Sequence, residues 1–161
     1  MTEHAPQDER QLAVHRIYTK DLSYEAPNAP EIFRQEWQPK HELDLNTKTD
    51  RLDDETFEVT LSVTATTRIA DKTALIVEVQ LAGLFGVRGF PKEELPHLLG
   101  AYCPNLLFPY VREIVSDLVT KGSFPQLLLQ PVNFDALFAQ HQQQLAEHAR
   151  RTEGDSGPTP H

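Results

Sequence analysis

The sequence predicts an α+β fold in which a four-stranded antiparallel sheet carries its helices on one face. The clearest observation is a run from Thr56 to Arg68, whose odd positions from Phe57 to Ala65 are apolar and whose even positions are mostly threonine, serine or glutamate. This alternation is typical of a half-buried strand. A second alternating run, Thr73 to Leu84, follows directly after Asp71-Lys72, so the two runs predict a hairpin. Helical spacing appears only later in the chain, and strands followed by helices indicate the α+β class.

Two further extended segments precede the hairpin. Val14 to Glu25 alternates apolar residues at even positions, including Tyr18, with polar residues at odd positions, which predicts an apolar inner face and an acidic outer face. Ile32 to Leu45 is also extended, but Pro39 lacks a backbone donor and predicts an edge or interrupted strand. The polar segment Asn46 to Asp54 is predicted to be a loop.

Glycines and prolines divide the second half of the chain. Glycines at 83, 86 and 89 predict the end of the hairpin and an irregular crossover. Pro91 or Pro96 suits the first turn of a helix. Pro104 and Pro109 predict that this helix ends near Cys103 and that the chain restarts after a proline-rich crossover.

Two more helices are expected after this crossover. Apolar residues recur at three- and four-residue steps from Tyr110 to Val119, which indicates a long amphipathic helix. It should stop at Lys121-Gly122, with the glycine in the left-handed conformation. Asn133 is a good N-cap for a final helix that reaches about Arg150.

Length and composition predict one domain over residues 13–150, with a disordered segment over 1–12 and a mobile tail over 151–161. The net charge of -9 argues against a nucleic-acid partner, although it suits a basic protein partner as well as simple solubility. A single cysteine excludes an internal disulfide and a multi-cysteine metal site. Because no leader or membrane-spanning run is apparent, we expect a cytoplasmic protein.

The sequence predicts no catalytic, cofactor or metal site. The three spaced glycines do not match a dinucleotide loop, and loop flexibility explains them. His97 and Cys103 have no third partner nearby in sequence, which favours a buried structural cysteine over a metal or nucleophile site. His141 and His148 would share a helix face, but two imidazoles alone favour a solvated surface.

Two surface features stand out from this background. Asp21, Glu25 and Glu78 share the outward parity of their strands beside Ile76. The pattern alone favours an ordinary wet sheet face, and the alternative is a surface that binds a basic partner. The chain also has more apolar and aromatic side chains than one small domain readily hides. They would line a groove for extended segments, or they would fill the core: Trp37, Leu43, Leu45, Leu84, Phe85, Phe134 and Phe138.

Several motifs carry a resemblance to a known family. Four lie in the helical half: Gly100-Ala101-Tyr102-Cys103-Pro104-Asn105, Leu107-Phe108-Pro109-Tyr110, Phe124-Pro125-Gln126-Leu127 and Pro131-Val132-Asn133-Phe134-Asp135-Ala136-Leu137-Phe138. Others lie in the strands: Arg16-Ile17-Tyr18-Thr19-Lys20-Asp21, Glu25-Ala26-Pro27-Asn28-Ala29-Pro30, Trp37-Gln38-Pro39, Leu43-Asp44-Leu45 and Glu78-Val79. Together they resemble SecB, the bacterial protein-export chaperone family, over roughly Arg16 to Phe138.

The resemblance implies a non-enzymatic homotetramer, built as a dimer of dimers and without a cofactor. Such a protein holds unfolded precursor proteins and passes them to the SecA motor ATPase. The family's SecA-binding positions fall on Asp21, Glu25, Ile76 and Glu78. Its subunit-association strand falls on Val77, Val79 and Leu81. Its client-binding groove falls near Trp37, Leu43, Leu45, Leu84, Phe85 and Phe138.

The sequence therefore predicts an ATP-independent holdase of the Sec export pathway, with no nucleic-acid partner and no membrane insertion. Weak apolar subsites along one unfolded chain would add up through effective concentration. The alternative is a SecB-like adaptor of the antitoxin-associated type, dedicated to one partner. An enzyme with a pocket between sheet and helices is a third and weaker hypothesis.

Overall fold

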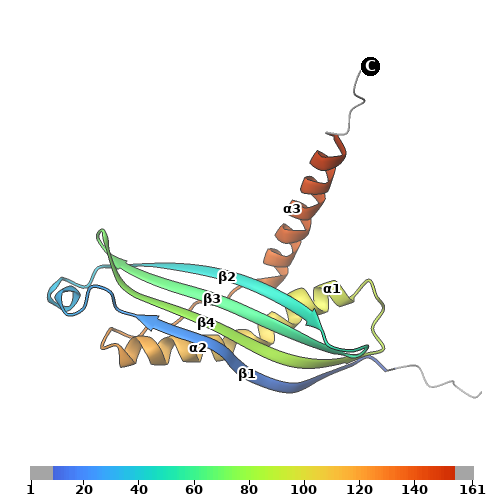
Figure 1. Ribbon diagram of the computed structural model, residues 1–161, viewed down its shortest axis with the longest axis horizontal. Helices are drawn as coiled ribbons and strands as arrows, with labels where there is room; N and C mark the ends of the chain where they lie inside the picture. The colour runs from blue at the N-terminus through green and yellow to red at the C-terminus, as the bar shows by residue number, and fades with distance from the viewer. Residues whose placement is uncertain (1–8, 155–161) are drawn as a thin grey trace, which may run out of the picture.

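The computed structural model describes residues 9–154 (Figure 1). Four long strands form one antiparallel sheet in the order β1-β4-β3-β2, and a long helical segment lies against one face. This confirms the predicted fold class. The elements, in chain order, are β1 (Gln11–Glu25), the 3-10 turn η1 (Glu31–Arg34), β2 (Pro39–Arg51), β3 (Thr56–Ile69), β4 (Lys72–Arg88), α1 (Leu95–His97), the π-helical turn η2 (Leu98–Tyr102), α2 (Cys103–Lys121) and α3 (Phe134–Gly154).

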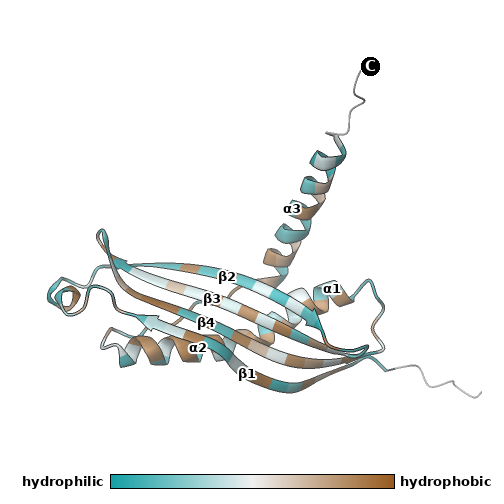
Figure 2. Ribbon diagram, viewed as in Figure 1, coloured by the Kyte–Doolittle hydropathy of each residue, from teal (hydrophilic) through white to brown (hydrophobic). Residues whose placement is uncertain are grey.

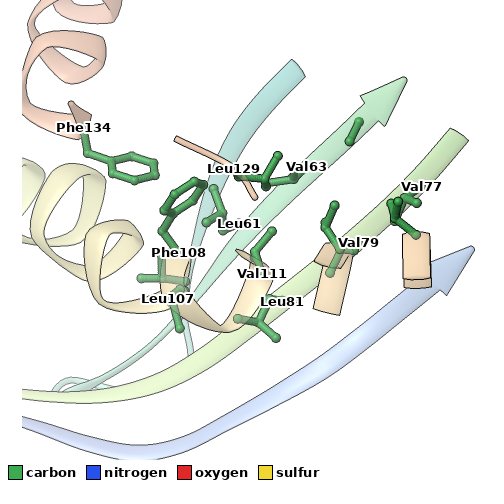
Figure 3. Packing of buried hydrophobic residues seen from close by; sticks show 14 of the residues in the cluster. Leu61, Val63, Val77, Val79, Leu81, Leu107, Phe108, Val111, Leu129 and Phe134 are labelled. Carbon is green, nitrogen blue, oxygen red and sulfur yellow. The ribbon is translucent and has the colours of Figure 1, made fainter. Parts of the chain in front are cut away.

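The core lies between α2 and the odd-numbered positions of β3 and β4. Leu61 lies opposite Leu81 in the register, and neither side chain is more than 2% exposed. Leu107 and Val111 of α2 are fully buried, and Figure 3 shows them beside this layer of the sheet. Hydropathy alternates along β3 and β4 (Figure 2), so strand period and burial agree. Within residues 9–154 no helix lies against the other face of the sheet, and we call it the open face.

Two strands are longer than predicted. Residues 46–51, expected in a loop, pair with β3 as the second half of β2. The segment Ile32 to Gln38, expected to be extended, instead contains the η1 turn. β4 continues through Gly83 and Gly86 to Arg88 because both β1 and β3 pair with it there. Pairing with neighbouring strands outweighs the low strand propensity of these residues.

The alternation expected in β1 is broken by two register shifts, one between Val14 and Arg16 and one between Thr19 and Asp21. As a result Tyr18 lies on the open face, where its hydroxyl donates to Glu58, so the prediction that it turns inward is wrong. β1 also begins at Gln11, inside the segment expected to be disordered. The rest of that prediction, residues 1–8, lies outside the described residues.

The helical half is more continuous than predicted. No break occurs near Cys103, because α1, η2 and α2 follow one another without a loop. The Cys103 N–H donates to the carbonyl of Leu98, so the hydrogen-bond spacing changes at this point and accommodates the missing donor of Pro104. Pro109 lies inside α2 on its exposed side. Pro96 does begin a helix, as expected.

The ends of α2 and α3 test the capping predictions. α2 stops at Lys121, as predicted, but Gly122 has φ -77° and the left-handed residue is Ser123, with φ 64°. The Asn133 side chain accepts a hydrogen bond from the Ala136 N–H at 3.0 Å, which confirms the predicted cap. α3 continues to Gly154, past the expected end, and projects away from the sheet (Figure 1). Residues 155–161 of the predicted tail lie outside the described residues.

Candidate binding surfaces

The carboxylates singled out from the sequence lie together on the open face. In the register between β1 and β4, Glu25 is opposite Ile76, Ser23 is opposite Glu78 and Asp21 is opposite Gln80. Directly opposed residues of an antiparallel pair share one face. Asp21, Glu25 and Glu78 are exposed and Ile76 is half-buried, so an apolar side chain lies among three carboxylates. We call this group the acidic face.

The acidic face extends further than the sequence predicted. Thr64 of β3 links Glu78 to Asp44 of β2 by direct register, and Thr66 likewise links Ile76 to Glu42. Glu42 and Asp44 are exposed, which places carboxylates at both margins of the sheet. Their parity relative to the apolar Leu43 was visible in the predicted extended segment, but the register that brings them beside Thr64 and Thr66 was not.

A groove lies on the opposite side of the sheet, between β2 and the first turns of α3. Its cavity of about 450 Å³ is lined from both elements and from η2. Leu45 and Phe138 line it, and Leu43 nearby on β2 is 37% exposed. The lining residues are Leu45, Asn46, Thr47, Thr49, Gly100, Phe134, Leu137, Phe138, Gln140, His141 and Gln144. We call this cavity the β2–α3 groove.

Three contacts fix the base of α3 and so shape this groove. The Phe134 ring is buried and packs edge-on against Phe108, with centroids 5.7 Å apart (Figure 3). The Phe138 ring covers Gly100, where a Cβ atom would lie 2.8 Å from a ring carbon, so only glycine permits this approach. His97 bonds to Asp135, with Nε2 and Oδ1 2.7 Å apart.

Trp37 lies at the start of β2 in a separate aromatic cluster. Its ring centroid is 5.8 Å from that of Phe124, and the Phe33 centroid is 5.0 Å from that of Phe124. Phe33 is 48% exposed. Apolar side chains therefore occur at both ends of β2, a strand whose 13 residues span roughly 40 Å and whose outer edge is unpaired within the described residues.

Several residues predicted for the groove or for the subunit interface do not lie on these surfaces. Phe85 is fully buried in the core and does not line the groove, because its odd position faces the helices. Leu84 is half-buried and lies opposite Glu58 on the open face, away from the groove. Val77, Val79 and Leu81 are at most 2% exposed, so their side chains face α2 and offer no contact surface to a second subunit.

A charged network lies next to the acidic face on the same side of the sheet. The Glu58 carboxylate accepts hydrogen bonds from Tyr18 and, at 2.8 Å, from the Lys20 ammonium. These bonds lower the pKa of Glu58. Burial, together with the Glu58 charge, raises the pKa of Tyr18 to about 12. The network ties β1 to β3 across β4.

No catalytic or metal site emerges from the geometry of residues 9–154. Cys103 is fully buried, and burial raises the pKa of its thiol to about 12, which keeps it protonated and unreactive at neutral pH. Across the described part of the chain, no three His, Cys, Asp or Glu side chains cluster as metal ligands would. Nor does any helix in that part have the length and apolarity to cross a membrane.

Comparison with known proteins decides the family. Residues 5–145 match the family described as preprotein translocase subunit SecB. The protein-export protein SecB of Methylococcus capsulatus is 51% identical over 150 residues, which cover 93% of this chain and 97% of that protein. The chain belongs to the SecB family. This confirms the resemblance inferred from the sequence motifs.

The fold of a SecB-like protein has also been solved. The SecB-like chaperone Rv1957 of Mycobacterium tuberculosis, determined with a ChAD peptide from an antitoxin, matches with a TM-score of 0.63. That match covers 75% of this chain and 90% of the other, at 21% identity, and therefore supports the fold alone. SecB proteins are export chaperones and not enzymes, so the two surfaces described above are candidates for binding preproteins and export partners.

Proposed function

We propose that this chain is an ATP-independent holdase that binds unfolded precursor proteins in the cytoplasm and delivers them to SecA. The observation that supports this most directly is the position of its two surfaces on opposite faces of one sheet. An apolar groove lies beside β2 on the helix side, and the acidic face lies on the open side. A client and a motor protein would therefore bind together without competing for the same side chains.

The β2–α3 groove suits an extended, unfolded segment. The backbone groups on the outer edge of β2 are available to pair with an added strand, and apolar side chains lie at both ends of β2. Each contact is shallow and lacks sequence preference, so affinity would come from several contacts along one chain. A folded protein has its apolar segments buried and cannot make these contacts. Trp37, Leu43, Leu45 and Phe138 are the client-binding residues that we propose.

The acidic face suits a basic partner, and we assign SecA binding to Asp21, Glu25, Ile76 and Glu78. Carboxylates around a half-buried isoleucine combine charge steering with an apolar anchor. Glu78→Lys should abolish or strongly weaken binding to SecA while leaving client binding unchanged, as measured by calorimetry with SecA and with an unfolded precursor. Unchanged affinity for SecA would show that the docking assignment is wrong. Glu147→Lys, the same charge reversal at an exposed carboxylate on the projecting part of α3, is a matched control.

We also propose that the chain assembles as a dimer of dimers. The outer edge of β1 has no partner strand in the described part of the chain, and Val14 and Leu22 on its helix side are 47% and 44% exposed. Tyr110 on α2 is 50% exposed as well. Such side chains fit an interface between identical subunits. Light scattering after gel filtration would measure the mass of the free protein and of its complex with a slow-folding precursor.

The same measurement separates the holdase from a dedicated adaptor. The holdase should bind the precursor only in its unfolded form, with four copies in the complex. Equal binding to the unfolded and native forms, or to neither, would favour an adaptor for one folded partner. The 51% identity to a protein-export protein, against 21% to the structure that holds an antitoxin peptide, favours the holdase.

A further inference from the structure

A histidine lies on the helix side of β2, among the apolar residues of that strand. His41 is opposite Thr67 in the register, and Thr67 is fully buried on the helix side of the sheet, so both side chains lie on that side. Leu43 and Leu45 follow on the same side, about 7 and 13 Å further along the strand. His41 is exposed, and it is the one titratable residue among the helix-side positions of β2 from 39 to 49.

His41 lies between the two apolar regions that we propose to hold a client. Trp37 and its aromatic neighbours come four residues before it, and Leu45, which lines the β2–α3 groove, comes four residues after it. An extended chain that contacts both regions would pass over His41. An imidazole at this place adds little to an apolar contact, so its polar atoms need a separate explanation.

The hydrogen bond between His41 and Thr67 fixes the tautomer of the ring. Nδ1 of His41 lies 2.8 Å from Oγ1 of Thr67. This is the one hydrogen bond of the Thr67 side chain within residues 9–154, and a buried hydroxyl hydrogen needs an acceptor. The hydroxyl therefore donates to Nδ1, which leaves the ring proton of neutral His41 on Nε2.

The Nε2–H group of His41 is available to a ligand. The hydrogen-bond directions of the two ring nitrogens diverge, so Nε2 is directed away from the buried Thr67. Within the part of the chain that the structure describes, Nε2 has no hydrogen-bond partner, and the side chain is exposed. The strand therefore presents a donor that a buried hydroxyl holds in one tautomer, and such a donor recognises an acceptor oxygen.

The acceptor that every unfolded chain offers is its backbone carbonyl. In a folded protein most carbonyls are paired within helices and sheets, whereas in an unfolded chain they are open to a new donor. A hydrogen bond to a carbonyl also needs no particular side chain in the client. A client carboxylate is the other candidate acceptor, but the net charge of -9 on this protein disfavours the approach of acidic side chains.

We propose that His41 is a specificity-determining residue for client binding, and that its Nε2–H group donates a hydrogen bond to a backbone carbonyl of the unfolded chain. Thr67 is a positioning residue that acts through His41. The inference rests on the proposed holdase function and adds to it a means of recognising an unpaired backbone. Selection of unfolded over folded chains would then depend on the backbone as well as on exposed apolar side chains.

The test compares two fluorescent, unstructured peptides at about pH 8, where an ordinary histidine is neutral. Both carry only leucine, phenylalanine, alanine and lysine side chains, none of which has a hydrogen-bond acceptor. In the second peptide, esters replace alternate amide bonds, because ester carbonyls are weaker acceptors. Fluorescence anisotropy should show that the full chain prefers the amide peptide, and His41→Leu should reduce this preference about five-fold.

Two further variants control this measurement. His41→Gln keeps a side-chain N–H donor and should retain part of the preference for the amide peptide. His148→Leu is the same loss of an exposed imidazole on the far part of α3, and it should leave the preference unchanged. Because each variant is judged by the ratio of two affinities, a general change in apolar contact with the peptide cancels.

Nitrogen NMR of the labelled chain tests the positioning role of Thr67. The two nitrogens of a neutral imidazole have distinct chemical shifts, which identify the nitrogen that carries the proton. His41 should be in the Nε2–H form. Thr67→Val removes the hydroxyl, so it should give a mixture of both tautomers and reduce the preference for the amide peptide.

The outcomes separate this inference from the holdase function. An Nδ1–H tautomer in the parent chain, or a His41→Leu variant with the parent's preference, would overturn the role of His41 while peptide binding itself still supported the groove. Binding of neither peptide to the parent chain would count against the holdase function, and the inference would fail with it. If Thr67→Val does not fold, the tautomer of the parent chain still decides whether Thr67 positions the ring.

Discussion

The two faces of the sheet are built from the same strands but by different rules. On the helix side, odd positions of β3 and β4 such as Leu61 and Val79 are buried against α2 and specify the fold. On the open side, even positions such as Ser62 and Glu78 have no helix above them in the part of the chain that the structure describes, and this side carries the candidate docking residues. Neighbouring residues of one strand point to opposite faces, so one residue can stabilise the fold while the next is available for binding. Substitutions on the two faces should therefore have separable effects.

The largest difference is expected for a pair of neighbours on β3. Leu61→Ala should lower the free energy of unfolding by about 2–5 kcal/mol, because it leaves a cavity in a fully buried layer. Ser62→Ala, one residue along on the open face, should change it by no more than about 0.5 kcal/mol. Urea unfolding of both variants measures the difference. Equal effects would mean that the open face is covered in solution.

The second prediction concerns the joint between the body and α3. Gly100→Ala places a methyl group against the Phe138 ring and should destabilise the base of α3 by about 1–3 kcal/mol. Hydrogen exchange should then speed up in the first turns of α3 while the sheet stays protected, and client affinity should fall. Gly154→Ala, which has no atom within 4 Å of the added carbon, is the control. Unchanged exchange in α3 would show that this contact does not hold the helix.

The sequence predicted the helix-side face better than the open face. Alternation alone placed Leu61, Val63 and Val79 in a core, because a single strand decides which of its residues share a face. The acidic face needs register across several strands, so Glu42 and Asp44 were missed although their segment was predicted to be extended. The groove depends on where α3 docks. That position is set by Gly100 and a π-helical turn, which no local periodicity reveals.

The third prediction concerns the buried hydroxyl group of Tyr24, on the helix side of the sheet. The Tyr24 hydroxyl is buried and has no hydrogen-bond partner among residues 9–154, and it fills the space beside Gly122 at the end of α2. Removing it should relieve the cost of an unpaired buried group, so Tyr24→Phe should stabilise the protein by about 1 kcal/mol. Tyr110→Phe, on a half-exposed side chain, should have no effect in the same thermal unfolding measurement. A loss of stability in Tyr24→Phe would indicate a bound water at that position.

The smallest expected effect is a change in how stability depends on pH, and it comes from Glu58 on the open face. Hydrogen bonds from Lys20 and Tyr18 lower the pKa of Glu58 below its ordinary value of 4.5. A carboxyl group with a lowered pKa in the folded state stabilises the fold above its ordinary pKa, and this contribution is lost as the pH falls through the folded value. Glu58→Gln should therefore reduce stability at neutral pH and flatten its decline below about pH 4.5.

The control for this pH profile is Glu78→Gln on the same face. Glu78 makes no ion pair or hydrogen bond among the described residues, so its removal should leave the profile unchanged. Urea unfolding between pH 3 and 7 compares the variants with the parent chain. If Glu58→Gln has the same profile as the parent, the network joins β1 to β3 without contributing to stability. The open face would then be free of any role in folding and its charges available for binding alone.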